Sequence, residues 1–247
     1  MSDGARPTLT VNWMFPDQLW LNGDRGNLMA LDRLGGQLGF DVVLNRIDDV
    51  STAVPADLAV FGSGDLEVLA SLAADGEALR AFLASSRRIV VFGTSIALFA
   101  RTTARVSHPG FAGLGLLPGD AVERPTDRHV YGDDLLVQYA PGSAHPDAAG
   151  VYVKTLSVTL DAGVTPFGRV LFGLDNTAKL NNQGDDGARH GSLIWTNLLG
   201  PAFVRNPWLA RSMVEDVLGP LPGELDGEWE LELASLDATR RFVAGKR

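Results

Sequence analysis

Short apolar runs alternate with longer segments of helical spacing over the first hundred residues. Leucines recur at positions 28, 31, 34 and 38, and Gly39 follows where a helix C-cap is expected. The pattern predicts strands at residues 8–14, 41–47, 57–61 and 88–92, and helices at residues 28–38 and 65–85. The second and third of these strands are short and apolar, as buried parallel strands are. Strands separated by helices of this length imply right-handed crossovers and a parallel sheet.

The second half of the chain is organised differently. Short runs that alternate or are continuously apolar lie between Gly, Pro and Asp turns, at residues 130–139, 150–160, 167–172 and 192–197. They predict an antiparallel portion that covers one edge of the parallel sheet. Pro207 is placed to begin a helix that reaches residue 218. We therefore predict one α/β domain over residues 1–222, followed by a charged tail, 223–247, that forms a surface helix or a docking segment.

Composition excludes several classes of protein. The chain of 247 residues has a net charge of −9 without a basic block, which argues against nucleic acid as a partner. It contains no cysteine, so disulfides, thiolate metal sites and a thiol nucleophile are excluded. No window reaches the ~18 apolar residues of a membrane span, and residues 1–7 do not resemble a signal peptide. We expect a cytoplasmic protein with no membrane span.

One stretch has the shape on which α/β enzymes mount a nucleophile. Residues 88–100 predict a buried strand, a sharp turn of small residues and a helix, an arrangement that can expose a catalytic side chain. The turn carries no cysteine, and no G-x-S-x-G pattern surrounds Ser95. A Ser-His-Asp site would need a histidine near Ser95. The four histidines are scattered and lack metal-site spacing, and we interpret His129 and His190 as surface residues.

Two polar loops have both a functional and a structural interpretation. The loop Gly62-Ser63-Gly64-Asp65 follows a predicted strand, where small residues let a ligand approach the backbone. An ordinary strand-to-helix turn with Asp65 as N-cap is the favoured interpretation of this loop taken alone. The segment Asp24-Arg25-Gly26-Asn27 could contact a substrate or partner, or simply cap a helix and form a local ion pair. Neither loop matches a dinucleotide or P-loop pattern, and we expect no cofactor and no metal.

Five segments in order resemble class I glutamine amidotransferases of the CobB/CobQ type. The resemblance runs from Phe15 to about Pro207 and is closest to the GatD branch, the glutaminase subunit of lipid II isoglutaminyl synthase. Residues 16–27 resemble the N-terminal signature of that branch, with its D-x-G-N core. The other matching segments are the loop 62–65, the G-L-G stretch 113–117, the segment 167–176 and the G-P to N-P ending 200–207. No single segment is specific, but five in the family's order are.

The resemblance implies a flavodoxin-like fold in which the catalytic residues are degenerate. The family elbow reads C-G-G-Y-Q, and aligning it here puts Gly93 at the cysteine, with Thr94 and Ser95 on the two glycines. Leu199 falls on the catalytic histidine, and residues 152–160 lack the Asn-His pair and the Arg of the glutamine-holding segment. Family members attack the glutamine amide with a thiolate that a histidine activates. Gly93 and Leu199 can supply neither group.

These assignments lead to one leading hypothesis and two alternatives. The leading one is a pseudo-amidotransferase that forms a heterodimer with a Mur-ligase-like partner of the MurT type. Its candidate pocket comprises Gly62, Ser63, Gly64, Asp65, Gly93, Thr94, Ser95 and Leu199. Its candidate partner-binding or structural residues are Asp17, Asp24, Arg25, Gly26, Asn27, Asp175 and Asn176. The alternatives are an enzyme with Ser95 or Thr94 as nucleophile or with Asp24, Asp65 and Asp175 as acid and base groups, and a metabolite-binding sensor.

Overall fold

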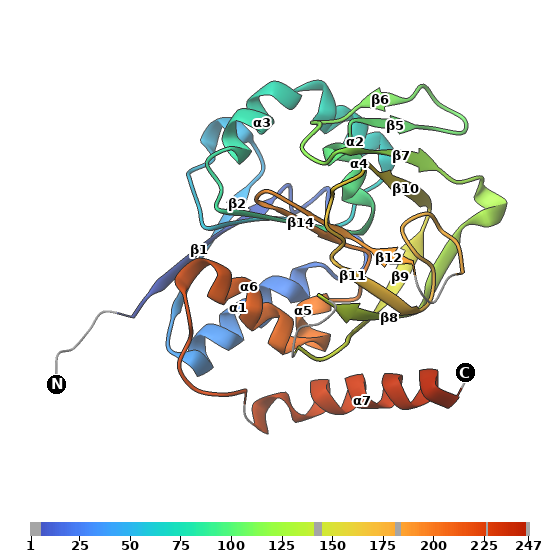
Figure 1. Ribbon diagram of the computed structural model, residues 1–247. Helices are drawn as coiled ribbons and strands as arrows, with labels where there is room; N and C mark the ends of the chain where they lie inside the picture. Colours follow the sequence, from blue (N-terminus) through green and yellow to red (C-terminus); the bar gives the residue numbers. More distant parts are fainter. Residues whose placement is uncertain (1–5, 141–144, 181–183, 226, 246–247) are drawn as a thin grey trace.

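A six-stranded sheet forms the centre of the computed structural model, which describes residues 6–140, 145–180, 184–225 and 227–245 (Figure 1). The strand order is β13-β14-β4-β3-β1-β2. The parallel strands are β1 (Thr8–Met14), β2 (Asp41–Ile47), β3 (Leu58–Phe61), β4 (Arg88–Phe92) and β14 (Leu193–Thr196). Strand β13 (Ala188–His190) pairs with β14 in the antiparallel direction. The predicted mixed α/β fold with a mostly parallel central sheet is confirmed.

Helices cover both faces of this sheet, and a hydrophobic core lies under each layer. One layer comprises α1 (Arg25–Leu38), α5 (Ala202–Arg205) and α6 (Pro207–Leu218), below the sheet in Figure 1. The other comprises α2 (Leu66–Ala74), α3 (Gly76–Leu83) and α4 (Ile96–Phe99). Successive side chains of a strand point to opposite faces, so Leu9 and Val11 of β1 pack under α1, whereas Met14 packs with α3 and α4.

Two four-stranded sheets make up the mostly antiparallel portion, in which β5 and β7 are the one pair of parallel strands among the described residues. The first has the order β10-β7-β5-β6, from β5 (Thr102–Ala104), β6 (Phe111–Ala112), β7 (Gly119–Glu123) and β10 (Leu156–Leu160). The second has the order β12-β11-β8-β9, from β8 (Val130–Tyr139), β9 (Ala148–Lys154), β11 (Gly168–Phe172) and β12 (Asp185–Asp186). Short 3₁₀ turns occur at η1 (Val50–Thr52), η2 (Gly93–Ser95), η3 (Thr126–Arg128) and η4 (Gly227–Trp229).

The chain closes with a long helix, α7 (Glu230–Gly245), that lies along the outside of the molecule (Figure 1). Its buried residues Leu236 and Val243 pack on Leu136 and Ala149 of the β8–β9 pair. Trp229, just before the helix, is fully buried, and the guanidinium of Arg33 lies 4.3 Å from its ring centroid. None of the helices in the described part of the chain has the length and apolar character needed to span a bilayer.

Several sequence predictions need correction. The helix predicted at 65–85 is two helices that meet at Asp75, because the Asp75-Gly76 pair is a poor helix former. The strand predicted at 150–160 is divided at Thr155 between β9 and β10, which belong to different sheets. Strand β2 was expected to be buried, but only Ile47 of it is, because β2 is the edge strand.

Candidate functional site

The predicted elbow forms a sharp turn between β4 and α4. Strand β4 ends at Phe92, the 3₁₀ turn η2 follows, and α4 is a single helical turn. Gly93 has φ +56°, in the left-handed region that side-chain-bearing residues rarely adopt. The indole Nε1 of Trp195 donates a hydrogen bond of 3.0 Å to the carbonyl oxygen of Gly93. Gly93 therefore turns the chain sharply at the carboxyl end of a central strand, in a conformation that glycine adopts without strain.

The space in front of Gly93 is filled by its neighbours. A Cβ atom built on Gly93 would lie 2.6 Å from the Oγ of Ser63 and 2.9 Å from a methyl carbon of Leu199. Leu199 is fixed in place by two backbone hydrogen bonds with Val151, of 2.8 and 3.2 Å. Ser63 is fully buried, and its hydroxyl donates to the carbonyl of Phe92 at 3.3 Å. The structure thus brings three of the predicted pocket residues, Gly93, Leu199 and Ser63, into direct contact.

Little free volume remains at the elbow. The cavity beside Gly93 measures about 10 Å³ and is lined by residues that include Thr94, Lys154, Trp195 and Asn197. A volume of this size holds about one water molecule. A glutamine side chain does not fit without displacement of the surrounding residues.

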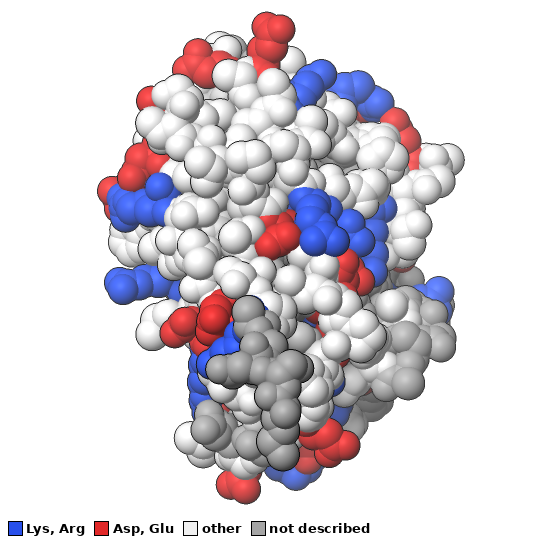
Figure 2. All heavy atoms as spheres, turned by 90° about the vertical axis from the view of Figure 1, so that its left-hand side faces the viewer, with Lys and Arg blue, Asp and Glu red and all other residues white. Residues whose placement is uncertain are grey.

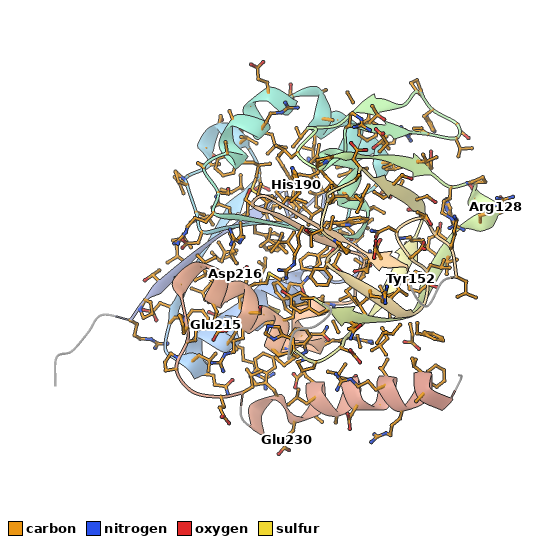
Figure 3. The ribbon with its side chains drawn as sticks, viewed as in Figure 1. Arg128, Tyr152, His190, Glu215, Asp216 and Glu230 are labelled. Atoms are coloured by element: carbon orange, nitrogen blue, oxygen red, sulfur yellow. The ribbon has the colours of Figure 1, made fainter. Side chains whose placement is uncertain are left out.

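The two hydroxyls of the elbow are occupied by backbone hydrogen bonds. Thr94 donates to the carbonyl of Gly64 at 2.7 Å, and Ser95, which is fully buried, donates to the carbonyl of Gly62. These bonds attach the loop 62–64 to the elbow. No hydrogen bond in the described residues joins either hydroxyl to a histidine, and His190, labelled in Figure 3, is exposed at the end of β13. None of the described histidines is therefore hydrogen-bonded to either hydroxyl as a base would be.

Asp24 is the buried carboxyl nearest to this loop. It is 4% exposed, and one of its oxygens accepts a hydrogen bond of 2.7 Å from the backbone N–H of Ser63. Its other oxygen has no partner. Burial raises the pKa of Asp24 to about 7, although the hydrogen bonds from Ser63 act in the opposite direction. Asp24 stands at the N-cap position of α1 but makes no capping hydrogen bond.

The rest of the segment 24–27 connects α1 to the start of α5. The Oδ1 of Asn27 accepts a hydrogen bond of 2.9 Å from the backbone of Phe203. A Cβ on Gly26 would lie 2.6 Å from the ring of Pro201, so glycine is needed for this close approach. The predicted local ion pair is absent, because Arg25 is exposed and forms no salt bridge within the described residues. Buried contacts between elements account for this segment.

A buried polar network that the sequence did not predict lies next to the elbow. Lys154, at the end of β9, is 2% exposed, and its ammonium donates to the Oδ1 of Asn197 at 3.0 Å. Burial lowers the pKa of Lys154 to about 8, while the charges of Asp186 and Asp175 act to raise it. Asp186 is fully buried, which raises its pKa, and accepts hydrogen bonds from Thr196 at 2.6 Å and Asn197 at 2.9 Å. These residues are far apart in sequence and follow no period, so no local pattern could reveal them.

The remaining predicted residues have structural positions. Asn176 belongs to the buried network and makes two hydrogen bonds with the backbone of Gly187, both of 2.8 Å. The carboxylate of Asp175 accepts hydrogen bonds from the backbone N–H and the hydroxyl of Thr177. Asp17 is exposed and pairs with Arg46, and Asp65 is the N-cap residue of α2 without a side-chain capping bond. Within the described residues, no group of three His, Asp or Glu side chains could hold a metal ion.

Two solved structures with a similar fold are glutamine amidotransferases. A crystal structure described as a glutamine amidotransferase matches with a TM-score of 0.56 at 16% identity, over 84% of this chain and 98% of the other. This chain has a glutamine amidotransferase-like fold. A second glutamine amidotransferase, from Thermotoga maritima, matches with a TM-score of 0.51 at 8% identity, over 84% of this chain and 81% of the other. No protein-family model and no curated protein sequence matches the chain significantly.

Proposed function

We propose that this protein is a pseudo-amidotransferase, a GatD-like subunit that has kept the fold and lost glutaminase chemistry. The observation that carries the proposal is the filled elbow. Gly93, the residue aligned with the family's nucleophile, has no side chain, and Leu199, the residue aligned with its base, packs against the place where that side chain would be. Attack on an amide needs a nucleophile, a base and room for the substrate. Gly93 and Leu199 supply neither the nucleophile nor the base at the positions aligned with the family's, and the cavity of about 10 Å³ leaves no room for glutamine.

The proposed role is that of a scaffold or regulatory subunit for an ATP-dependent, amide-forming partner of the Mur-ligase type. Two features support it. The first is the resemblance of residues 16–27 and 200–207 to the GatD branch. The second is that Asn27 and Gly26 of the first segment contact Phe203 and Pro201 of the second, so the residues that hold this part of the fold together are retained. Without a glutaminase site the complex takes its ammonia, or another amine, from solution.

A repurposed pocket is less well supported. The hydroxyls of Thr94 and Ser95 both donate to backbone carbonyls, and neither is hydrogen-bonded to a histidine within the described residues. The cavity of about 10 Å³ is also too small for a metabolite. Asp24, Asp65 and Asp175 do not converge on a common space: one is buried beside Ser63, one begins α2, and one folds back on Thr177.

Ammonia release from glutamine tests the proposal. We expect the wild-type chain to release ammonia at the background rate, both alone and mixed with a MurT-type ligase. Release above background that is abolished by Leu199→Ala would overturn the proposal. Co-purification with the ligase on size exclusion tests the scaffold role separately, and failure to associate would remove that part alone.

A triple variant tests separately whether Ser63 and Leu199 block the elbow. Gly93→Cys alone places a side chain against Ser63 and Leu199, whereas Ser63→Gly and Leu199→His together remove both obstacles and supply a base. We expect a single thiol at residue 93 to react with iodoacetamide several-fold faster in the triple variant than in Gly93→Cys, because the thiol gains both space and a base. Equal rates would mean that Leu199 and Ser63 do not block the elbow.

A further inference from the structure

A large groove lies away from the elbow, between helix α3 and the loop that follows strand β2. Its volume is about 910 Å³. Apolar side chains form its floor: Phe15, Val50, Leu72, Leu79 and Phe82. One side of α3 forms a wall of the groove, through residues 77, 78, 81 and 82. Their spacing of i, i+1, i+4 and i+5 places them on the same side of a helix. The groove is therefore a helix-lined apolar trough on the surface.

The rim of the groove is acidic. Four carboxylates line it, from Asp48, Asp49, Asp75 and Glu77, and no Lys, Arg or His does. Asp48 is neutralised by Arg46, whose Nε lies 2.8 Å from its carboxylate. The other three form no salt bridge with any described residue. Figure 2 views the side of the molecule on which α3 and β2 lie, and its upper half is largely uncharged, with charged residues of both signs along its border.

Three unpaired negative charges around an apolar floor define the chemistry of a fitting occupant. Burying the floor needs apolar side chains, and the rim attracts cations while it repels phosphates and anionic lipid. None of the residues that line the groove belongs to a strand, because they come from α3, the end of α2, Phe15 and the loop 48–51. Strand addition is therefore not available there, which leaves the mode in which an amphipathic helix lies in a groove.

We propose that this groove docks a basic amphipathic helix of a partner protein. The apolar face of the helix lies on Val50, Leu72 and Phe82, which are half-buried and line the groove. Its flanking Lys or Arg residues pair with Asp49, Asp75 and Glu77. The proposal goes beyond the proposed function, because it does not depend on whether the elbow is active or which protein provides the helix.

The experiment uses a fluorescein-labelled amphipathic peptide of about 14 Leu and Lys residues, titrated with the full chain and followed by anisotropy at physiological ionic strength. An equivalent Leu/Glu peptide controls for charge. Ala78→Arg places a bulky cation inside the groove at an exposed position of α3. Ala84→Arg adds the same charge at an exposed position outside the groove, just after the same helix.

We expect the Leu/Lys peptide to bind and the Leu/Glu peptide not to bind. Ala78→Arg should weaken binding by at least about tenfold, while Ala84→Arg changes it by less than about twofold. Circular dichroism and thermal unfolding check that both variants fold. Failure of the wild-type chain to bind, or equal weakening in both variants, would overturn the proposal. The second outcome would indicate attraction to the net charge of the protein instead of the groove. Neither outcome affects the glutaminase assay.

Discussion

Gly93 and Asp24 both contact Ser63, in the short loop 62–64. The Oγ of Ser63 lies 2.6 Å from the position of a Cβ on Gly93, and the backbone N–H of Ser63 donates to Asp24. A Cβ on Gly62 would lie 2.2 Å from the carbonyl oxygen of Leu19 and 2.8 Å from the Cβ of Asp24, so this loop tolerates no larger residue. Protein atoms therefore fill the space beside this loop, which one interpretation of the sequence assigned to a ligand.

The burial of Asp24 makes stability depend on pH. Its pKa is 3.8 in the unfolded chain and about 7 in the folded protein, so between these values the folded state binds more protons. The free energy of unfolding therefore falls as pH rises from about 4 to about 7, by up to about 4 kcal/mol, and this contribution stays lost above pH 7. We expect Asp24→Asn to remove that slope and to be more stable than the wild-type chain at about pH 8.

Urea unfolding between about pH 5 and pH 8 measures this difference. Asp65→Asn is the matched control, because Asp65 is exposed and, like Asp24, stands at an N-cap position without a capping bond. The control should keep the slope of the wild-type chain. An Asp24→Asn variant with the same pH dependence as the wild-type chain would show that the carboxyl of Asp24 titrates near its ordinary pKa.

Helix α7 is attached to the body by few apolar contacts. Leu236 and Val243 are its only buried side chains among the described residues, and they pack on Leu136 and Ala149. Leu231 on the same helix is 84% exposed. Elements held by small clusters open locally more readily than the main core does.

Leu236→Ala should loosen α7 without unfolding the domain. We expect a loss of about 2 kcal/mol, at the low end for a buried leucine, because the satellite cluster is small. Hydrogen exchange should speed up in residues 230–245 and stay unchanged in β1 and β3. Leu231→Ala should change stability by less than about 0.5 kcal/mol. Uniformly faster exchange in Leu236→Ala would mean that α7 is part of the main cooperative unit.

The local sequence pattern was sufficient to predict the bounds of elements that depend mainly on their own residues. The strands at 8–14 and 41–47 and the helix at 207–218 have the predicted bounds, and Gly39 ends α1 in the left-handed conformation. Pattern could not reveal that Thr155 divides two strands, because that depends on which sheet each half joins. At the site, the strand and turn before Gly93 were visible in the sequence. The packing of Leu199 and the partnership of Lys154 with Asn197 arise from contacts between distant segments.

At the scale of the whole molecule, the central sheet and the β8–β9 sheet are joined next to the elbow. Leu199 follows β14 of the central sheet and forms a bridge with Val151 of β9. Lys154 of the same strand donates to Asn197, which follows β14 as well. The side chain that fills the elbow is therefore held by the contact between two sheets. Loss of that contact would affect both the stability of the molecule and the closure of the elbow.

Lys154→Met tests this junction, because it removes the hydrogen bond to Asn197 and a buried positive charge that attracts the carboxylate of Asp186. We expect a loss of about 3–5 kcal/mol. Without the lysine the pKa of Asp186 rises further above its unfolded value, so the variant should continue to lose stability up to a higher pH than the wild-type chain. Lys179→Met, at an exposed position, should stay within about 0.5 kcal/mol of the wild-type stability.

In a cycle with Asp186→Asn, the double variant should be more stable than the sum of the single effects by at least about 1 kcal/mol. Additive losses would mean that Lys154 and Asp186 stabilise the two sheets independently.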